Sequence, residues 1–369
     1  MGNFFSMALF MAVAMISAVS CNNGNTQPSP EPDPDPEVAA FAKGADIGWA
    51  SEMADDGIVF RNAAGQEREC TALMKELGFD AVRYRVWVNP PEGWNGKDDV
   101  VAKAKTASDL GMRIMIDFHY SDWWADPQQQ NIPEAWAGYS FESLCRAIQD
   151  HTREVLTALK EAGVSPEWVQ VGNETSDGML WDTGKASLSM SNYAVMTASG
   201  YNAVKEIFPD AKVIVHLDHG DRPDLYNWIF DGLKDNGGKW DMIGMSLYPE
   251  YYAHDTEAQY QEGDYKSVTD ATLENALALY RKYGTPVMIC EAGMTWNKED
   301  ESYAFLNDLI TRARALGDGK ACAGVFYWEP ECNPAWTSDI YKELGWSSYN
   351  KGAFDENFQP TKALDAFKN

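Results

Sequence analysis

The sequence predicts an α/β fold, a single (β/α)8 TIM barrel in which eight parallel strands alternate with eight helices. Three observations support that fold class. From residue 44 onward, short apolar runs alternate with longer segments of helical periodicity, and no second linker interrupts them. Several helical segments end directly before a glycine, as at Leu77-Gly78 and Tyr283-Gly284. A doubly wound open sheet is the competing architecture, but Ile47-Gly48-Trp49-Ala50 lacks its glycine-rich phosphate turn.

Each expected strand is short and apolar and leads into a longer helical segment. The strands are expected at residues 45–48, 81–88, 113–118, 168–172, 212–217, 241–247, 287–290 and 321–327. The helices are expected near residues 67–77, 98–110, 141–162, 189–207, 222–236, 267–283, 300–315 and 360–367. One catalytic domain is therefore expected over residues 41–369, with functional side chains in the loops after the strands.

The first forty residues have a different composition. Residues 4–19 form one apolar run, which is short for a membrane span and typical of a signal peptide. The run ends in Ala18-Val19-Ser20-Cys21, which resembles a bacterial lipobox, although no positive charge precedes it. We expect a lipoprotein-type signal peptide over residues 1–20 and lipidation of Cys21, with ordinary secretion as the alternative. Residues 21–40 alternate proline and acid and predict a disordered tether.

Charge and cysteine content exclude several classes of partner. The formal net charge is −26, and removing the four acids of residues 1–38 leaves −22. Such a field repels phosphate backbones, so nucleic acid is excluded and a neutral polymer is favoured. The five cysteines after Cys21 include no Cys-x-x-Cys pair, which argues against a zinc site and a disulfide framework. The 14 Trp and 17 Tyr offer rings on which sugars stack.

Two glutamates end apolar strand segments on opposite sides of the predicted barrel mouth. Glu174 follows Val171-Gly172-Asn173, and Glu291 follows Met288-Ile289-Cys290. Either one alone is more simply a structural residue, such as an acid in the first turn of a helix. As a pair across the mouth they fit a retaining glycosidase, which needs two carboxyl groups about 5–5.5 Å apart. One of the two must keep its proton, through burial or through the charge of the other.

Several separate blocks of the sequence resemble the endo-β-1,4-galactanases of glycoside hydrolase family 53, in clan A. The blocks are Gly44-Ala45-Asp46, residues 82–90 (VRYRVWVNP), 117–122 (DFHYSD), 124–127 (WADP), 171–174 (VGNE), 215–218 (VHLD), 246–249 (SLYP) and 326–330 (FYWEP). The resemblance implies endo-acting, retaining hydrolysis of galactan and of type I arabinogalactan in pectin side chains. It makes Glu174 the general acid/base and Glu291 the nucleophile, and it implies no cofactor for the chemistry.

Four further residues are expected to support the two glutamates. Arg83 and Arg85 point to one face of their strand, so one or both could hold Glu291 ionised or form a structural ion pair. Tyr248 follows the sixth strand and is placed to donate a hydrogen bond to Glu291. Asn173 beside Glu174 could bind the sugar 2-hydroxyl.

Other strand-end residues are expected to line the cleft. His119 lacks a neighbouring second histidine, so we interpret it as a hydrogen-bonded imidazole rather than a metal ligand, and we interpret His216 and Asp218 likewise. Asp122 and Asp126 are expected to bind sugar hydroxyls. Trp328 is expected to form the floor of the central subsite. Stacking platforms are expected among the other loop tryptophans, which are Trp49, Trp87, Trp124, Trp136 and Trp296.

The chain departs from the family pattern at Thr175, at Ala292-Gly293-Met294 and at Glu331-Cys332-Asn333, so the eighth loop is expected to be reshaped. Some bacterial members hold calcium between the last two loops, where Asp300, Glu301 and Asp339 offer oxygens here. The expected protein is an exported, membrane-anchored bacterial lipoprotein and a monomer that binds polysaccharide. Alternatives are a clan A hydrolase of another β-1,4-glycan, such as mannan or xylan, and a non-catalytic glycan-binding lipoprotein.

Overall fold

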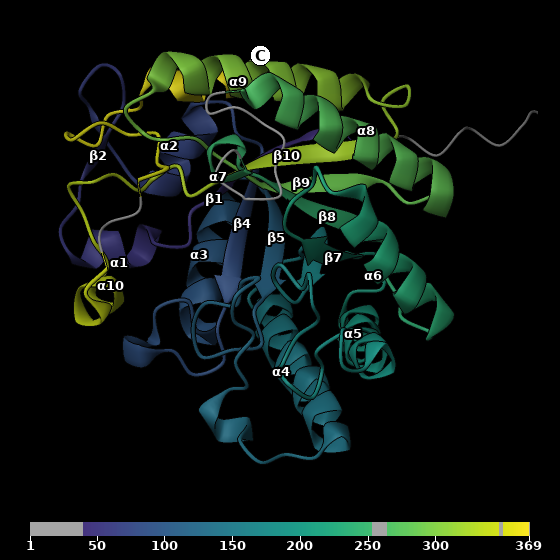
Figure 1. Cartoon of the computed structure of the whole chain (residues 1–369). Helices are drawn as coiled ribbons and strands as arrows, with labels where there is room; N and C mark the ends of the chain where they lie inside the picture. The colour runs from purple at the N-terminus through teal and green to yellow at the C-terminus, as the bar shows by residue number, and fades with distance from the viewer. Residues whose placement is uncertain (1–39, 253–263, 347–349, 369) are drawn as a thin grey trace, which may run out of the picture. The chain divides into compact units, whose positions relative to one another are not determined.

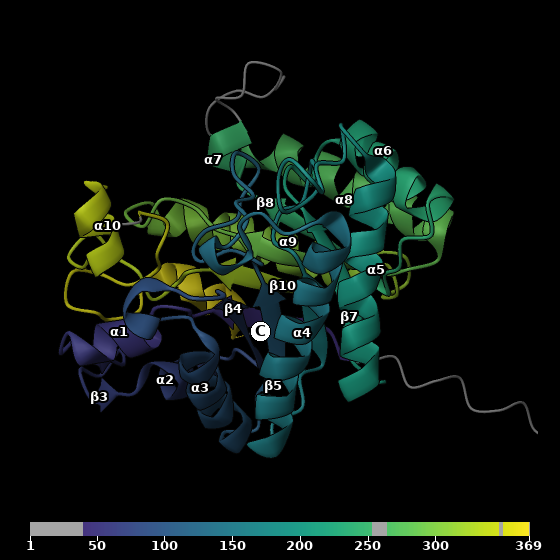
Figure 2. The same cartoon turned by 90° about the horizontal axis from the view of Figure 1, so that it is seen from below.

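The strands close into an eight-stranded parallel barrel. A computed structural model describes residues 40–252, 264–346 and 350–368. Within them β1 pairs with both β4 and β10, which closes the order β1-β10-β9-β8-β7-β6-β5-β4. The longer helices lie outside the strands (Figures 1 and 2). This is the (β/α)8 barrel that the sequence predicts.

The barrel strands are β1 (Ala42–Asp46), β4 (Ala81–Val86), β5 (Arg113–Phe118), β6 (Trp168–Val171), β7 (Lys212–Leu217), β8 (Met242–Leu247), β9 (Val287–Ala292) and β10 (Cys322–Trp328). A two-stranded hairpin joins β2 (Phe60–Arg61) and β3 (Glu67–Arg68). The α-helices are α1 (Ala50–Asp55), α2 (Cys70–Glu76), α3 (Lys97–Asp109), α4 (Phe141–Glu161), α5 (Met190–Ile207), α6 (Pro223–Asp235), α7 (Pro249–Tyr252), α8 (Tyr265–Tyr283), α9 (Glu299–Ala315) and α10 (Asp339–Leu344). Three 3₁₀ turns are η1 (Pro91–Gly93), η2 (Glu134–Trp136) and η3 (Lys362–Phe367).

The strand sequences divide the barrel interior into an apolar floor and a polar mouth. Every strand contributes at least one side chain to a buried floor cluster, which consists of Ala42, Ala81, Met115, Trp168, Ile214, Met242, Met288, Cys290 and Phe326. Strand side chains alternate between two faces, so a residue two positions further on points inward again, one layer nearer the mouth. That next residue is polar in several strands: Arg83 follows Ala81, Asp117 follows Met115 and His216 follows Ile214. The alternation thus produces a buried polar layer directly beneath the cleft.

Two local features fix how the strands meet. A side-chain carbon on Gly44 would lie 2.0 Å from the Phe326 ring, so glycine in β1 lets that ring fill the barrel floor. Between β8 and β9 the register shifts after Met245, and Ser246 becomes the partner of Glu291. Such irregularities re-aim side chains next to functional sites. Here the shift brings Ser246 to the mouth beside both glutamates.

Several sequence-based boundaries were wrong. The helix expected near residues 360–367 is the 3₁₀ turn η3, and the short helices α1, α7 and α10 were not expected. β9 continues to Ala292, so Glu291 lies inside a strand rather than after one. β10 ends at Trp328 and β1 begins at Ala42, because ladder hydrogen bonds to neighbouring strands decide these ends.

The remaining expectations concern the cysteines and the N-terminal segments. Cys70, Cys145, Cys290, Cys322 and Cys332 are all buried and unpaired. The signal peptide, Cys21 and nearly all of the tether lie outside the described residues. No helix in the described part of the chain is long and apolar enough to cross a membrane.

Candidate active site

A cleft of about 900 Å³ lies over the barrel mouth and contains both glutamates. It is lined by loops that follow several strands, so residues far apart in the chain meet there. Its lining residues are Trp124, Ala125, Asp126, Pro127, Gln128, Gln129, Asn173, Glu174, Asp218, His219, Tyr248, Tyr251, Tyr252, Glu291, Trp328, Tyr341 and Trp346.

The backbone around Glu174 is held in an uncommon conformation. Gly172 and Glu174 have φ values of +89° and +43°. The amide of Gly172 donates to Phe118 O at 3.0 Å, and that of Thr175 donates to His216 O at 2.8 Å. Non-glycine residues adopt positive φ only where the surroundings impose it, commonly at functional sites. The two neighbouring strands therefore turn Glu174 toward the cleft.

The two glutamates lie close enough to act on the two atoms of one bond. One carboxylate oxygen of Glu174, one of Glu291 and one ring nitrogen of His216 all lie within 4.8 Å of one another. Retaining glycosidases place their carboxyl groups about 5–5.5 Å apart, whereas inverting enzymes leave about 6.5–9.5 Å for a water molecule. The spacing between Glu174 and Glu291 fits the retaining arrangement.

Glu291 has a cation and a hydroxyl donor as direct neighbours. Arg83 Nη2 lies 3.1 Å from its Oε1, and the Tyr248 hydroxyl donates to its Oε2 at 2.8 Å. Burial raises the pKa of Glu291 to about 7, while Arg83 and the Tyr248 hydrogen bond oppose that rise. Both neighbours favour the ionised form of Glu291.

Arg83 is itself fixed by the polar layer beneath the cleft. Its guanidinium donates to Asp46 at 2.7 Å, to Asp117 at 2.8 Å and to Gln170 at 2.7 Å. A buried guanidinium with this many partners has one orientation. Arg83 therefore lies beside Glu291 and also forms an ion pair inside the barrel, the two outcomes that the sequence left open.

Arg85 does not reach either catalytic candidate. It pairs with Glu329, and its guanidinium lies 4.1 Å from the Trp49 ring centre and 4.4 Å from that of Trp124. Of the two outcomes that the sequence left open, Arg85 adopts the structural ion pair, because a neighbouring acid after β10 and two aromatic faces attract its charge. Its contact with the site is indirect, through Trp124.

Glu174 has the opposite electrostatic setting from Glu291. Burial raises its pKa well above the ordinary value, and the negative charges of Glu291 and Asp218 raise it further. No cation is bonded to Glu174 in the described structure; its partner is the Ser246 hydroxyl, 2.6 Å from Oε1. One proton shared by the two carboxyl groups therefore resides on Glu174.

Ser246 connects Glu174 to His216, a role that the sequence did not reveal. The Ser246 oxygen lies 2.9 Å from His216 Nε2, and His216 Nδ1 lies 3.0 Å from both Asn173 Oδ1 and the Gln170 amide nitrogen. Burial and the charge of Arg83 hold the pKa of His216 well below its usual value, so the ring is neutral. A neutral imidazole carries one N–H and one acceptor nitrogen.

The donors and acceptors of this hydrogen-bond chain can exchange roles when the protonation state of Glu174 changes. When Glu174 is protonated it donates to Ser246, Ser246 donates to His216 Nε2, and Nδ1–H donates to Asn173. When Glu174 is ionised Ser246 donates to it, Nε2–H donates to Ser246, and Nδ1 accepts from Gln170. Arg83 donates to Asn173 Oδ1 in both arrangements, whereas the Gln170 amide hydrogen that faces Nδ1 finds an acceptor there only when Glu174 is ionised. The chain can therefore accommodate both protonation states of Glu174.

Asn173 and His119 are held by several contacts each. Asn173 Oδ1 accepts from Arg83 at 2.8 Å, and Nδ2 donates to Ala125 O at 2.8 Å, which leaves a second amide hydrogen for a ligand. His119 Nδ1 accepts from the Ala125 amide at 3.0 Å, so Nε2–H donates to Asp117 at 3.1 Å. His119 is therefore a hydrogen-bonded imidazole, as interpreted from the sequence, but it is buried and does not line the cleft as expected.

The acids of the third and fifth loops differ in their accessibility. Asp126 and Asp218 line the cleft, and Asp218 accepts from Ser176 Oγ at 2.5 Å. Asp122 does not line it, because both its oxygens accept backbone N–H groups, from Asn89 at 3.0 Å and from Glu134 at 2.8 Å. Asp122 therefore joins two loops, which is a supporting role beside the lining of the cleft.

The tryptophans divide between the cleft and the packing beneath it. Trp124 and Trp328 line the cleft, with ring centres 5.7 Å apart. Trp49 and Trp87 are buried against each other, so neither is a platform, and neither Trp136 nor Trp296 lines the cleft. Sequence reasoning missed the more exposed rings of the cleft, Tyr251 (52% exposed) and Trp346 (45% exposed).

The expected calcium donors do not converge. Asp300 pairs with Lys362, and Asp339 pairs with Lys342 at 2.6 Å. Within residues 40–252, 264–346 and 350–368, three potential metal-ligating side chains come together at Glu174, His216 and Glu291, and no such group includes these acids. Both His216 nitrogens already have protein partners, so we interpret the trio as acid–base machinery rather than as a metal site.

A (β/α)8 barrel with two opposed carboxyl groups in an aromatic cleft at the carboxyl ends of its strands defines a glycoside hydrolase. The comparisons with known proteins identify the family. The model of glycosyl hydrolase family 53 matches residues 42–304 and 299–367, and the chain belongs to that family.

Named relatives and solved structures agree with this membership. The chain is 31% identical to a probable arabinogalactan endo-β-1,4-galactanase A of Aspergillus terreus, over 87% of this chain and 93% of that one. It is 29% identical to an endo-β-1,4-galactanase of Bacillus subtilis, over 85% and 75% of the two chains. A structure of fungal β-1,4-galactanases superposes with a TM-score of 0.77 at 27% identity, over 89% of this chain and 99% of that one.

Proposed function

We propose that this enzyme is an endo-acting β-1,4-galactanase that hydrolyses galactan and type I arabinogalactan with retention of configuration. The observation that carries the mechanism is the asymmetry of the two opposed carboxyl groups. Glu291 contacts Arg83 and Tyr248, whereas Glu174 contacts the neutral Ser246–His216 pair. The substrate class is supported by relatives that are named as endo-β-1,4-galactanases.

In the first step Glu174 gives the glycosidic oxygen the proton that it otherwise donates to Ser246, while a carboxylate oxygen of Glu291 attacks the anomeric carbon from the opposite face. The bond to the leaving sugar breaks and a covalent galactosyl ester forms on Glu291. Arg83 and Tyr248 hold the attacking carboxylate ionised and oriented before the step. The remaining amide hydrogen of Asn173 is positioned for the sugar 2-hydroxyl, a bond that strengthens in the oxocarbenium-like transition state.

In the second step Glu174 acts as a base. Its pKa falls once Glu291 is an ester, because the negative charge that raised that pKa has disappeared. Ionised Glu174 takes a proton from water, the water oxygen attacks the anomeric carbon, and Glu291 leaves as a carboxylate. Ser246 and His216 reverse their hydrogen bonds between the two steps. Two inversions give net retention.

The other cleft residues bind the polymer. Trp124 and Trp328 present ring faces to the apolar faces of sugars, and Asp126, Asp218 and His119 supply or position hydrogen-bonding groups around them. The cleft of about 900 Å³ has space for several sugars, which favours cleavage within a chain. Three residues outside the lining of the cleft support this arrangement: Arg85, Trp87 and Asp122.

Incubation with galactan, mannan and xylan, followed by product separation, tests the substrate. Cleavage of galactan to oligosaccharides is expected; cleavage of mannan or xylan alone would assign another β-1,4-glycan. Proton NMR of the first products should show the β anomer, and an initial α anomer would exclude the retaining mechanism. Glu291→Ala should abolish turnover but leave polymer binding, with Glu274→Ala on exposed α8 as the matched control. Polymer binding without any hydrolysis by the parent protein would identify a glycan-binding protein.

The acid/base role of Glu174 has its own test. Glu174→Ala should lose hydrolysis of galactan, whose leaving sugar needs a proton. It should still react with an aryl galactoside that carries a good leaving group, and azide should accelerate release of the product. Equal loss on both substrates, without azide rescue, would contradict the assignment.

We also propose that the enzyme is exported as a lipoprotein, anchored through Cys21 and otherwise monomeric. Cys21→Ser should move the enzyme from the membrane fraction to the soluble fraction and abolish incorporation of labelled fatty acid. Light scattering of the chain without residues 1–20 should give the mass of one copy. Calcium near Asp300, Glu301 or Asp339 predicts a lower melting temperature in chelator, and an unchanged melting curve would exclude a structural ion.

A further inference from the structure

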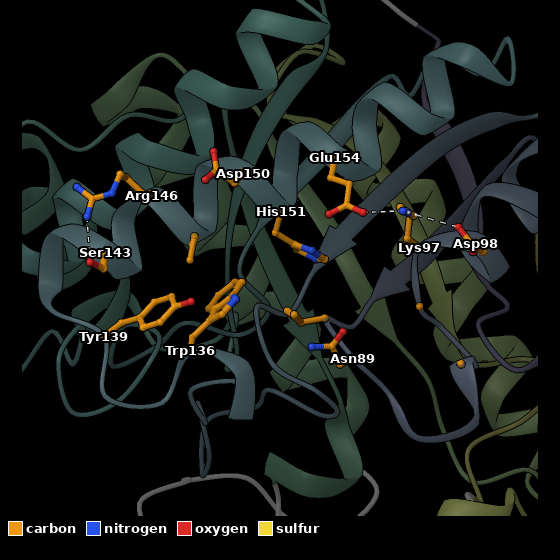
Figure 3. Close-up of a pocket in the computed structure, with 14 residues that line it drawn as sticks. Asn89, Lys97, Asp98, Trp136, Tyr139, Ser143, Arg146, Asp150, His151 and Glu154 are labelled. Carbon is orange, nitrogen blue, oxygen red and sulfur yellow. Dashed lines mark hydrogen bonds and ion pairs between the residues drawn. The ribbon is translucent and has the colours of Figure 1, made fainter.

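A second cavity lies beside the barrel mouth, between the first turn of α3 and the N-terminal half of α4 (Figure 3). It measures about 740 Å³ and shares no lining residue with the catalytic cleft. Its wall consists of the β4–α3 loop, the end of the β5–α4 loop and one face of α4. None of its side chains has a role in the proposed mechanism.

The β5–α4 loop contributes lining residues to both the catalytic cleft and the second cavity. Residues 124–129 of the β5–α4 loop line the cleft, and Trp136 and Tyr139 of the same loop line the second cavity. Asp122 accepts hydrogen bonds from Asn89 in one wall of the cavity and from the amide of Glu134 at the start of η2. The β5–α4 loop therefore borders both the catalytic cleft and the second cavity.

The lining combines aromatic surface with hydrogen-bonding groups. Tyr139 is 46% exposed, whereas Trp136 is buried and packs edge-on against His151 at a ring separation of 6.1 Å. Figure 3 shows Tyr139 and Trp136 side by side, with His151 beyond them and Asn89 on the same side of the cavity. An accessible ring next to polar side chains is the combination that binds the two kinds of surface of a sugar.

The charges of the cavity favour a neutral ligand. Lys97 pairs with Glu154 at 2.5 Å, and Arg146 donates to Ser143 at 3.0 Å. Asp98 and Asp150 add further negative charge, so an anion has no excess positive field to bind it.

One buried group of the cavity has no protein partner. Burial lowers the pKa of His151 to about 4, which leaves a neutral ring, and its Nε2 has no hydrogen-bond partner among the described residues. This nitrogen has almost no accessible surface, so the ring forms part of the cavity wall, and the exposed Asn89 amide is the group that matches uncharged hydroxyl groups.

We infer that this cavity is a secondary glycan-binding site that holds a distant segment of the same β-1,4-galactan chain. The inference rests on the proposed function, which supplies the polymer. Binding one chain at two places raises the local concentration of its other segments at the cleft. The benefit is therefore confined to substrates long enough to reach both sites.

The test separates binding to the polymer from cleavage of short substrates. Tyr139→Ala in the full chain should raise KM for galactan about fivefold, the size of one aromatic contact. Retention in a galactan-containing gel, measured in the Glu291→Ala background, should weaken by a similar factor. Arg146→Ala should weaken retention as well, and kcat/KM for galactotetraose should not change. Tyr139→Phe, which keeps the ring, and Trp228→Ala, which removes a ring on α6 that is 43% exposed, are the controls.

Unchanged retention of both Tyr139→Ala and Arg146→Ala would overturn the inference. An equal loss on galactotetraose would overturn it too, because the substitutions would then act on the catalytic cleft. If the parent enzyme cleaves mannan or xylan instead of galactan, the proposed function fails, and the same retention test with the polymer that is cleaved still decides the second site.

Discussion

Ser246→Ala is the sharpest test of how the barrel sets the protonation of Glu174. The Ser246 hydroxyl lies 2.6 Å from Glu174 Oε1 and 2.9 Å from His216 Nε2. A hydrogen bond to an ionised group contributes about 1.5–3 kcal/mol. One pKa unit corresponds to about 1.36 kcal/mol, so losing a donor to ionised Glu174 should raise its pKa by about one to two units. Because Ser246 also accepts from protonated Glu174, we expect about one unit.

The assay is kcat/KM against pH. Glu174 must be protonated for the first step, so a higher pKa moves the alkaline limb of the profile to higher pH. Ionised Glu174 is needed for the second step, so the rate of that step should fall at low pH. An aryl galactoside with a good leaving group needs no acid in the first step, and its alkaline limb should not move.

Ser246→Thr keeps the hydroxyl and should keep the alkaline limb of the parent enzyme. Ser176→Ala removes a hydroxyl that is bonded to Asp218 rather than to either glutamate, and it controls for a general change in the cleft. A melting curve confirms that Ser246→Ala is folded. An alkaline limb that stays in place, or that moves to lower pH, would refute the hydrogen-bond chain.

Three further predictions follow from the same structure. Tyr248→Phe removes a donor to the Glu291 carboxylate, so the pKa of Glu291 should rise and the acidic limb of the kcat/KM profile should move to higher pH. Steady-state kinetics should also show kcat lower by roughly 10²-fold. Gly44→Ala would place a carbon 2.0 Å from the Phe326 ring and should destabilise the fold by about 1–3 kcal/mol in urea unfolding, and an unchanged midpoint would contradict the packing argument. Burial raises the pKa of Glu52 from 4.5 to about 7, so its contribution to stability is complete below pH 4.5 and is lost as the pH rises to about 7. Chemical denaturation of Glu52→Gln should therefore show a free energy of unfolding that varies less with pH over that range.

Most strands and long helices could be predicted from local sequence patterns. Seven of the eight expected strands begin at the residue where the structure begins them or one residue earlier, and the long helices differ by one or two residues at their ends. Period-two apolar runs and glycine-terminated helical segments are properties of neighbouring residues, so they can be recognised without tertiary contacts. The final 3₁₀ turn and the short helices α1, α7 and α10 could not be recognised in this way, because isolated turns depend on the packing around them.

The supporting residues show where local reasoning stopped. Alternation along β4 placed Arg83 and Arg85 on the same face, but it could not divide them between Glu291 and Glu329. Asp122 follows a strand as a sugar-binding residue would, yet the approach of two loops gives both its oxygens backbone partners. Each outcome depends on which group, distant in the chain, lies within hydrogen-bonding distance in the folded barrel.

The sequence by itself determined the barrel, the two glutamates and the aromatic, acidic character of the protein, because strand and helix periodicity and the residues that end each strand are local. The family resemblance assigned the acid/base role to Glu174, but only the tertiary structure shows a physical basis for the difference between the two glutamates. That asymmetry comes from Arg83 and Tyr248 on one side and from Ser246 on the other, and Ser246 lies 72 residues from Glu174 in the chain. A register shift between β8 and β9 brings Ser246 to the site, and barrel closure fixes that register through all eight strands.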